Sequence, residues 1–107
     1  MSKTKILTKI YELAFLIPEK ESKEEAIKFY ESINVLLQEE DALLIDFYSP
    51  QLVNLAYEIK KQKTAFLAST TFQARVEKIE KIKEKIKKLE KEGEILRFLL
   101  FAKKVKM

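Results

Sequence analysis

The sequence predicts an all-α protein, a single compact bundle of five to six helices over residues 1–107. Helix-forming residues dominate the composition. Glycine occurs once and proline twice, so the tight turns that a β protein needs are nearly absent. Apolar residues make up 47% of the chain, which is too many for a disordered protein and suits one folded core. We therefore expect one helical domain.

The first expected helix covers residues 6–17 and ends before Pro18. Its apolar residues recur at helical steps, from Ile6 through Ile10 and Leu13. A second helix begins at Ser22, because a serine followed three residues later by a glutamate forms a capping box. Its apolar face would consist of Ala26, Phe29, Tyr30, Ile33, Leu36 and Leu37.

The middle of the chain predicts two more helices. Asp41 can cap a short helix over residues 42–47. Ser49 followed by Pro50 is a typical helix start, since proline at the first helical position loses no hydrogen bond. The helix that follows would bury Leu52, Val53, Leu55, Ala56 and Ile59. Residues 65–68 fit either a connecting turn or further helix.

The last third predicts a long charged helix and a short apolar one. Thr70 and Gln73 form a second capping box, and the long helix after them has a narrow apolar seam. The seam consists of Val76, Ile79, Ile82, Ile86 and Leu89. Gly93 stands where a left-handed helix cap is favoured. The final helix, from Ile95 to Lys104, is apolar almost all round, so it would lie in the core or against another chain.

The composition excludes most kinds of catalytic site. The chain has no cysteine and no histidine, which removes disulfides, thiolate ligands, cysteine nucleophiles, imidazole triads and most zinc sites. A single glycine cannot build a phosphate-binding loop. We expect no enzyme activity, metal, cofactor or small-molecule substrate. No segment has the length and composition of a signal peptide or a membrane span, so we expect a cytoplasmic protein.

Charge divides the chain into an acidic and a basic half. Residues 1–50 carry 6 Lys against 10 Asp and Glu, a net of −4, and residues 51–107 carry 15 Lys and Arg against 7 Glu, a net of +8. A basic half suits a polyanion or an acidic partner, although a solvated Lys/Glu-rich surface has the same composition.

Two sets of basic residues stand out within that half. Lys60, Lys61 and Lys63 would end a helix, where positive charge also favours the helix dipole. Arg75 would begin a stripe along the long helix to which RNA phosphates could bind, continued by Lys78, Lys81, Lys85 and Lys88. Most of the aromatic residues are expected in the core, and Tyr48 and Tyr57 are the exceptions, because their hydroxyls need partners or water.

The order of segments over residues 22–102 resembles the small helical subunit of type III-A CRISPR effector (Csm) complexes. The matching segments are Ser22-Lys23 at a helix start, the run DALL at 41–44, LVNLAYEIKKQK at 52–63, the charged helix, and Arg97-Phe98 at the start of an aromatic-rich helix. The sequence departs from the family at Glu58-Ile59-Lys60, where members have Ala-Gly-Arg, and at the missing helix-start arginine.

This resemblance implies a non-catalytic subunit of an RNA-guided complex in antiviral defense. Its partners would be single-stranded target RNA, contacted through phosphates, and other effector-complex subunits. Lys23 and Arg97 match basic positions of the family, Lys60 replaces the family arginine, and Lys61 and Lys63 are added from local charge. With Arg75, these six residues are the predicted RNA-binding set.

Two other functions remain open from the sequence. Bacteriocin immunity proteins of the pediocin type resemble the chain in length, basic charge and helix content, and would recognise a membrane receptor complex. A helical adaptor would instead use the apolar segment from Ile95 to Ala102 as an interface, with self-association as one outcome.

Overall fold

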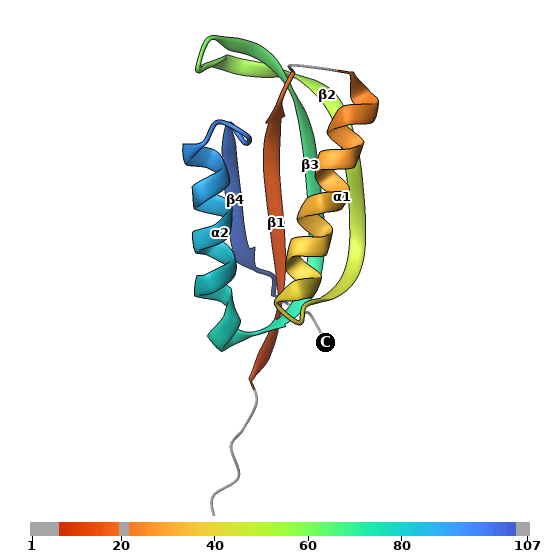
Figure 1. Ribbon diagram of the computed structural model, residues 1–107, viewed down its shortest axis with the longest axis vertical. Helices are drawn as coiled ribbons and strands as arrows, with labels where there is room; N and C mark the ends of the chain where they lie inside the picture. Colours follow the sequence, from red (N-terminus) through yellow and green to blue (C-terminus); the bar gives the residue numbers. More distant parts are fainter. Residues whose placement is uncertain (1–6, 20–21, 105–107) are drawn as a thin grey trace, which may run out of the picture.

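A four-stranded antiparallel sheet forms the centre of the protein, and two helices lie against one of its faces (Figure 1). The computed structural model describes residues 7–19 and 22–104. Along the chain the elements are β1 (Thr8–Pro18), α1 (Lys23–Glu39), β2 (Leu43–Ile59), β3 (Gln62–Arg75), the short 3₁₀ helix η1 (Val76–Lys78), α2 (Ile79–Lys91) and β4 (Arg97–Ala102). The strand order is β2-β3-β1-β4, so β1 and β3 are the central strands.

The prediction of an all-α bundle is wrong, and β1 shows the physical reason. From Tyr11 to Ile17 every second side chain is buried, namely Tyr11, Leu13, Phe15 and Ile17, as expected of a strand with one face on the core. The helical interpretation used Leu13 and Ile17, which are four residues apart and fit both periods. Ile6, where the predicted helix began, lies outside the described residues.

The two helices predicted over residues 42–59 are instead one long strand, β2, at the edge of the sheet. Pro50 does not start a helix. It lies where the register with β3 shifts, between Tyr48 and Gln51, and an edge position tolerates its missing N–H. Residues 65–68 and the second predicted capping box, Thr70 to Gln73, belong to β3.

The last predicted helix is instead strand β4. It is apolar on both faces, of which only one packs against the core. Phe98 and Leu100 pack against the main core, whereas Leu99 and Phe101 are exposed on the other face of the sheet. A short apolar run fits a helix or a strand equally well by periodicity. Pairing with β1, from Leu16–Arg97 to Tyr11–Ala102, makes it a strand here.

Both long amphipathic helices were predicted correctly. Helix α1 follows Ser22, whose side chain accepts a hydrogen bond from the Glu25 backbone N–H at 3.4 Å. Helix α2 buries Ile82 and Ile86 of the predicted seam. Gly93 has a φ of 84°, the left-handed conformation expected of a helix cap.

The main core lies between the sheet and the two helices. Its largest fully buried apolar side chains include Leu13, Phe15, Ile33, Leu37, Phe72, Ile82, Ile86 and Ile95. A second, smaller cluster lies where the β2–β3 hairpin meets the start of β4, and it contains Ile59, Ala65 and Leu96, with Leu16 and Leu55 packed against it. This second cluster fixes the hairpin to the rest of the sheet.

A polar chain inside the core fixes α1 against the middle of β3. The Tyr30 hydroxyl donates to the Ser69 backbone oxygen at 2.7 Å, and the fully buried Thr70 hydroxyl donates to Asn34 Oδ1 at 2.6 Å. Polar groups buried with their partners favour one register over its neighbours, since any shift of β3 would leave them unpaired.

Within residues 7–19 and 22–104, neither helix has the length and apolar character needed to cross a membrane.

Candidate nucleic-acid interface

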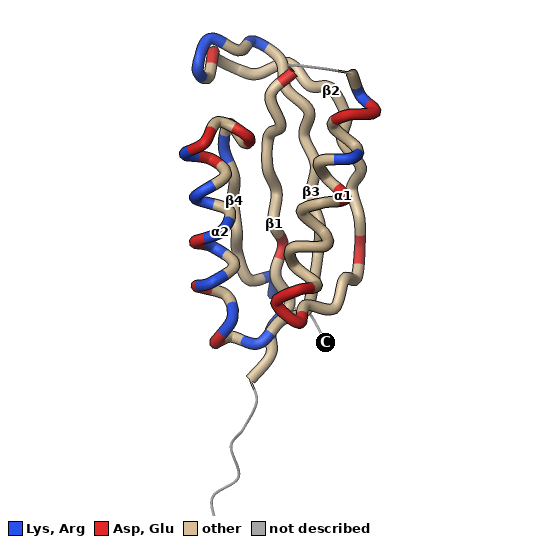
Figure 2. The backbone as a smooth tube through the Cα atoms, viewed as in Figure 1, with Lys and Arg blue, Asp and Glu red and all other residues tan. Residues whose placement is uncertain are grey.

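Three of the predicted RNA-binding residues lie together at the end of the β2–β3 hairpin. Ile59 pairs with Gln62, so Lys60 and Lys61 form a two-residue turn, and Lys63 follows on β3. We call Lys60, Lys61 and Lys63 the hairpin lysines. The hairpin reaches past the ends of β1 and β4, and its end is basic (Figures 1 and 2). The prediction that these lysines end a helix is therefore wrong, but they are clustered.

The turn places two lysines in the left-handed region of backbone conformation. Lys60 has a φ of 49° and Lys61 a φ of 67°. Two-residue hairpin turns with positive φ at both positions favour Asn-Gly, because a side chain with a Cβ is strained there. Strained residues of this kind are found preferentially at functional sites.

We expect the double substitution Lys60→Asn/Lys61→Gly to raise the free energy of unfolding by about 1–2 kcal/mol, because it removes the left-handed strain. Urea denaturation measures the change. Lys63→Asn is the matched control, since Lys63 has no positive φ and loses the same kind of side chain. A double variant no more stable than this control would show that the turn stores no strain.

The hairpin end is also held against α2. The Lys60 side-chain nitrogen donates to the Glu90 backbone oxygen at 3.4 Å, in the last turn of α2. A cation at that place is favourable, because the carboxyl end of a helix carries partial negative charge. Ile59, next to the turn, is buried in the second apolar cluster. The lysines are therefore presented from a fixed support.

The other three candidate residues are spread more widely. Arg97 begins β4, at the same end of the sheet as the hairpin turn, and its Nη1 donates to the Leu96 backbone oxygen at 3.0 Å. Lys23 begins α1 beside the acidic Glu24. Arg75 ends β3 at the opposite end of the sheet, where it forms an ion pair with Glu77 at 3.7 Å. Arg75 is therefore far along the sheet from the hairpin lysines.

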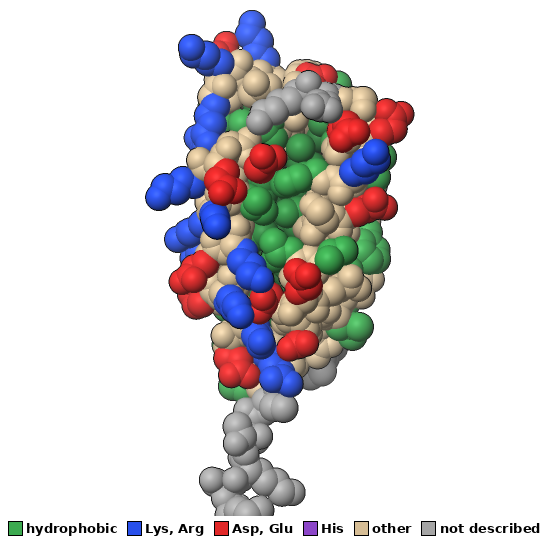
Figure 3. All heavy atoms as spheres, viewed as in Figure 1, with side chains coloured by type: hydrophobic (Ala, Val, Ile, Leu, Met, Phe, Trp, Pro, Cys, Tyr) green, Lys and Arg blue, Asp and Glu red, His purple; other side chains and the backbone are tan. Residues whose placement is uncertain are grey.

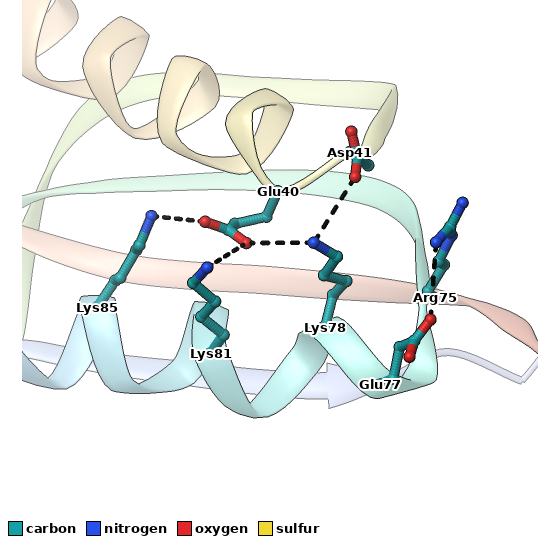
Figure 4. Close-up of polar contacts among 7 residues, drawn as sticks. All are labelled: Glu40, Asp41, Arg75, Glu77, Lys78, Lys81 and Lys85. Carbon is teal, nitrogen blue, oxygen red and sulfur yellow. Dashed lines mark hydrogen bonds and ion pairs between the residues drawn. The ribbon is translucent and has the colours of Figure 1, made fainter.

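The predicted basic stripe on the long helix serves a structural purpose over half of its length. Three of its lysines converge on Glu40, the capping residue directly after α1 (Figure 4). The distances to a Glu40 carboxylate oxygen are 3.9 Å from Lys78, 3.7 Å from Lys81 and 2.6 Å from Lys85. Glu40 is only 4% exposed, so these contacts tie α1 to α2. The sequence gives no sign of this cluster, because Glu40 stands between the exposed acidic residues Glu39 and Asp41.

The lysines lower the pKa of Glu40 below its ordinary value of 4.5. The hydrogen bond from Lys85 contributes most, burial opposes it, and the charges of Lys81, Lys85 and Lys78 add to the lowering. A carboxylate whose pKa is lower in the folded than in the unfolded protein stabilises the fold above the unfolded pKa. That stability is lost as the pH falls through the folded pKa.

We expect Glu40→Gln to lower the Tm by several degrees at pH 7, because glutamine leaves three lysines without their carboxylate. The difference in Tm from the wild type should shrink as the pH falls below about 4.5, since protonated Glu40 resembles glutamine. Thermal unfolding of both proteins between pH 3 and pH 7 measures it. Glu39→Gln, at an exposed neighbour, is the control. A difference that is the same at every pH would contradict the account.

The face of the sheet away from the helices is open and mixed in character. Its central strands contribute Ile10, Glu12, Ala14 and Leu16 from β1 and Leu67, Ser69, Thr71 and Gln73 from β3, with no aromatic ring among them. RNA-binding sheets typically stack bases on aromatic side chains. A pocket of about 160 Å³ is lined by Glu12, Asp46, Phe47, Tyr48, Ser69 and Thr71. The exposed rings on this face, Tyr48 and Phe101, therefore lie on the edge strands β2 and β4 and not at its centre.

No group of three or more metal-ligating side chains comes together in the part of the chain that the structure describes. The other chemical feature of the surface is its concentration of basic side chains. Lys and Arg side chains follow one side of the molecule, over α2 and up to the end of the hairpin (Figure 3).

Comparison with known proteins decides which family has this arrangement. The family model described as ribosomal protein S6 matches residues 10–102, which is most of the chain. The chain belongs to the ribosomal protein S6 family. Among curated proteins, none matches it.

Solved structures with this fold include a ribosomal protein. The 30S ribosomal protein S6 from Thermotoga maritima is similar with a TM-score of 0.80 and 20% identity, over 91% of this chain and 89% of that one. A protein described as unknown, from Galdieria sulphuraria, is similar with a TM-score of 0.64 and 15% identity. That match covers 97% of this chain and 54% of the longer protein. At these identities the likeness shows the shared fold alone.

Membership in the S6 family corrects the functions expected from the sequence. The resemblance to a Csm subunit was wrong, and with it the assignment to CRISPR antiviral defense and its effector-complex partners. That resemblance rested on helical segments that are strands here. The bacteriocin immunity alternative is wrong for the same reason. Proteins of the S6 family are structural components of the ribosome and not enzymes, so the prediction of a non-catalytic protein is confirmed.

Proposed function

We propose that this protein is an RNA-binding component of the small ribosomal subunit and that the hairpin lysines contact ribosomal RNA phosphates. Family membership and the basic second half of the chain support it. The observation that carries the proposal is that three lysines meet at the end of one hairpin without a carboxylate from the described part of the chain to neutralise them. Among the described residues they form no ion pair with a carboxylate, whereas Lys78, Lys81 and Lys85 are all paired with Glu40.

Lysine suits this kind of contact because its ammonium group is a compact point charge without a fixed geometry. Contacts of this kind hold the phosphate backbone and do not read the base sequence. Each phosphate that a lysine neutralises releases bound counterions from the RNA, so the affinity falls as salt rises.

A salt titration of RNA binding tests the proposal. With three phosphate contacts, the plot of log affinity against log salt should have a slope of about −2 to −3 for small-subunit ribosomal RNA fragments, and a steeper one if further lysines take part. The wild-type protein and labelled fragments in a filter-binding or anisotropy assay are sufficient. An affinity that is unchanged between low and moderate salt would overturn the proposal.

The open face of the sheet is the proposed site for a protein partner within the subunit. Leu99 is 61% exposed, and Phe101 is exposed two residues further along the same edge strand, β4. Glu12 and Asp46 line the pocket on this face. Glu12 is paired with Lys103 at 3.2 Å, so Asp46 is the carboxylate to which a basic partner with apolar side chains could bind. Leu99→Asp should weaken binding to other small-subunit proteins and leave RNA binding through the hairpin unchanged. If Leu99→Asp binds the other small-subunit proteins as the wild type does, this face is not their binding site.

The other expectations from the sequence stay proposals, and those for the remaining basic residues and for self-association are restated here for the observed fold. Arg97 can extend the RNA contact, since it shares the hairpin's end of the sheet, whereas Lys23 and Arg75 would need separate stretches of RNA. Self-association through residues 95–102 would now use β4, because an edge strand has one side free to pair with a second copy. A single domain over residues 1–107 and a cytoplasmic location also stay proposals.

A further inference from the structure

Tyr57 is the most exposed of the large apolar and aromatic side chains in the described part of the protein, at 72%. A single exposed ring is common on protein surfaces and needs no explanation by itself. The backbone around Tyr57 is what makes it unusual, because the regular pairing of the hairpin is interrupted at that point.

The interruption is a bulge in β2. Asn54 pairs with Thr64 and Ile59 pairs with Gln62, so residues 55–58 stand opposite the single residue Lys63. Bulges of this kind bend a strand and redirect its side chains, and they are frequent beside functional sites. Leu55, the first residue of the bulged segment, and Ile59, which follows that segment, pack into the second apolar cluster. The bulge is therefore anchored on both sides while Tyr57 is left in solvent.

Tyr57 shares this part of the hairpin with the hairpin lysines. All four residues lie between positions 57 and 63, with Lys63 directly across from the bulge and the strained turn three residues after Tyr57. An exposed ring and three ammonium groups on the same end of one hairpin match the two halves of a nucleotide, an aromatic base and a phosphate.

We infer that the hairpin end binds an unpaired nucleotide, whose base stacks on Tyr57 while the hairpin lysines hold the phosphates around it. This inference rests on the proposed RNA-binding function and narrows the ligand to RNA that carries a base outside a duplex. A base inside a helix is covered by its neighbours, so its face is not available to a side chain. A bulge, a loop or a strand end offers that face.

Stacking and phosphate contact leave different signatures in a binding curve. Loss of one base-stacking ring lowers the affinity by about 5- to 150-fold. Stacking releases no counterions from the RNA, so its loss should leave the salt slope unchanged. Removal of the hairpin lysines makes the slope less steep. The two kinds of contact can therefore be separated in one experiment.

Tyr57→Leu is the main test, because leucine keeps the apolar character and removes the ring. Its affinity is measured on two RNAs, a duplex with one unpaired nucleotide and the same duplex fully paired, each over a range of salt. Tyr48→Leu is the matched control, since Tyr48 is also exposed but lies on the open face of the sheet. The chain has no tryptophan, so Tyr57→Trp adds a single indole that reports stacking by quenching of its fluorescence.

We expect Tyr57→Leu to bind the RNA with the unpaired nucleotide about tenfold more weakly at an unchanged salt slope. Binding to the paired duplex and all binding by Tyr48→Leu should match the wild type, and Tyr57→Trp should bind and be quenched. Wild-type affinity in Tyr57→Leu, or an unquenched Tyr57→Trp in the bound state, would overturn the stacking inference. If a variant with all three hairpin lysines replaced by glutamine still loses affinity in that case, the proposed function stands. If neither variant loses affinity, both fall.

Discussion

A variant that carries Lys60→Gln, Lys61→Gln and Lys63→Gln is expected to bind small-subunit ribosomal RNA about 10- to 100-fold more weakly than the wild type near physiological salt. Three phosphate contacts contribute about two orders of magnitude to the binding constant there, through the counterions that they release. The salt slope should become less steep by about 2 to 3 units. Anisotropy titrations at four or more salt concentrations measure both quantities.

The matched control removes the same charge from another basic surface. Lys83, Lys87 and Lys91 are exposed on α2 and form no ion pair among the described residues. Their triple substitution to glutamine should weaken binding only slightly, as expected of a general loss of positive charge. If this control loses as much affinity as the hairpin variant, the RNA contact is not concentrated at the hairpin.

Phe72→Ala is expected to lower the free energy of unfolding by about 3–5 kcal/mol, the cost of removing a large aromatic side chain from a packed core. Phe72 is 0% exposed, lies on the central strand β3 and stacks on Tyr11 with a centroid distance of 5.8 Å. A loss of this size is a large part of the stability of a small domain. Urea denaturation followed by circular dichroism measures it.

Phe47→Ala is the corresponding control on the edge strand. Phe47 is 56% exposed, so its loss should cost less than about 1 kcal/mol. The pair of variants tests which strand lies in the core. Equal losses in the two variants would contradict the assignment of β3 to the centre of the sheet and β2 to its edge.

The sequence predicted the two helices because their determinants are local. Ser22 and Glu25 form a capping box, and the seam of α2 repeats every three to four residues. The strands depend on partners that are distant in the chain. Phe15 pairs with Ala68 on β3 and with Phe98 on β4, each more than fifty residues away. No window of neighbouring residues contains that information.

The scarcity of glycine and proline predicted an all-α fold wrongly, for a topological reason. Helices α1 and α2 make two of the three connections between strands, so only the β2–β3 connection is a tight turn. That turn is made by Lys60 and Lys61 in left-handed conformation, and Asp41, with a φ of 65°, lies between α1 and β2. A count of glycines predicts turns only if glycine occupies most left-handed backbone positions. Here lysine and aspartate occupy them.

The candidate site was predicted in part. The basic character of residues 60–63 was visible in the sequence, but their place on a hairpin end required the pairing of Ile59 with Gln62. Tyr57 stood out for its hydroxyl, whereas the bulge that exposes it appears only in the register with β3. The ion pairs of Glu40 join residues 38 to 45 positions apart and had no signal in the sequence.

The central claim, that the end of the hairpin lies against ribosomal RNA, is tested most directly by cleavage from a tethered probe. The chain has no cysteine, so Lys61→Cys carries a single thiol to which an iron chelate can be attached. Hydroxyl radicals from the chelate cut only nearby RNA. We expect cuts in bound small-subunit ribosomal RNA from position 61 and none from Glu31→Cys, at an exposed position of α1. Cuts from position 31 with none from position 61 would contradict the claim.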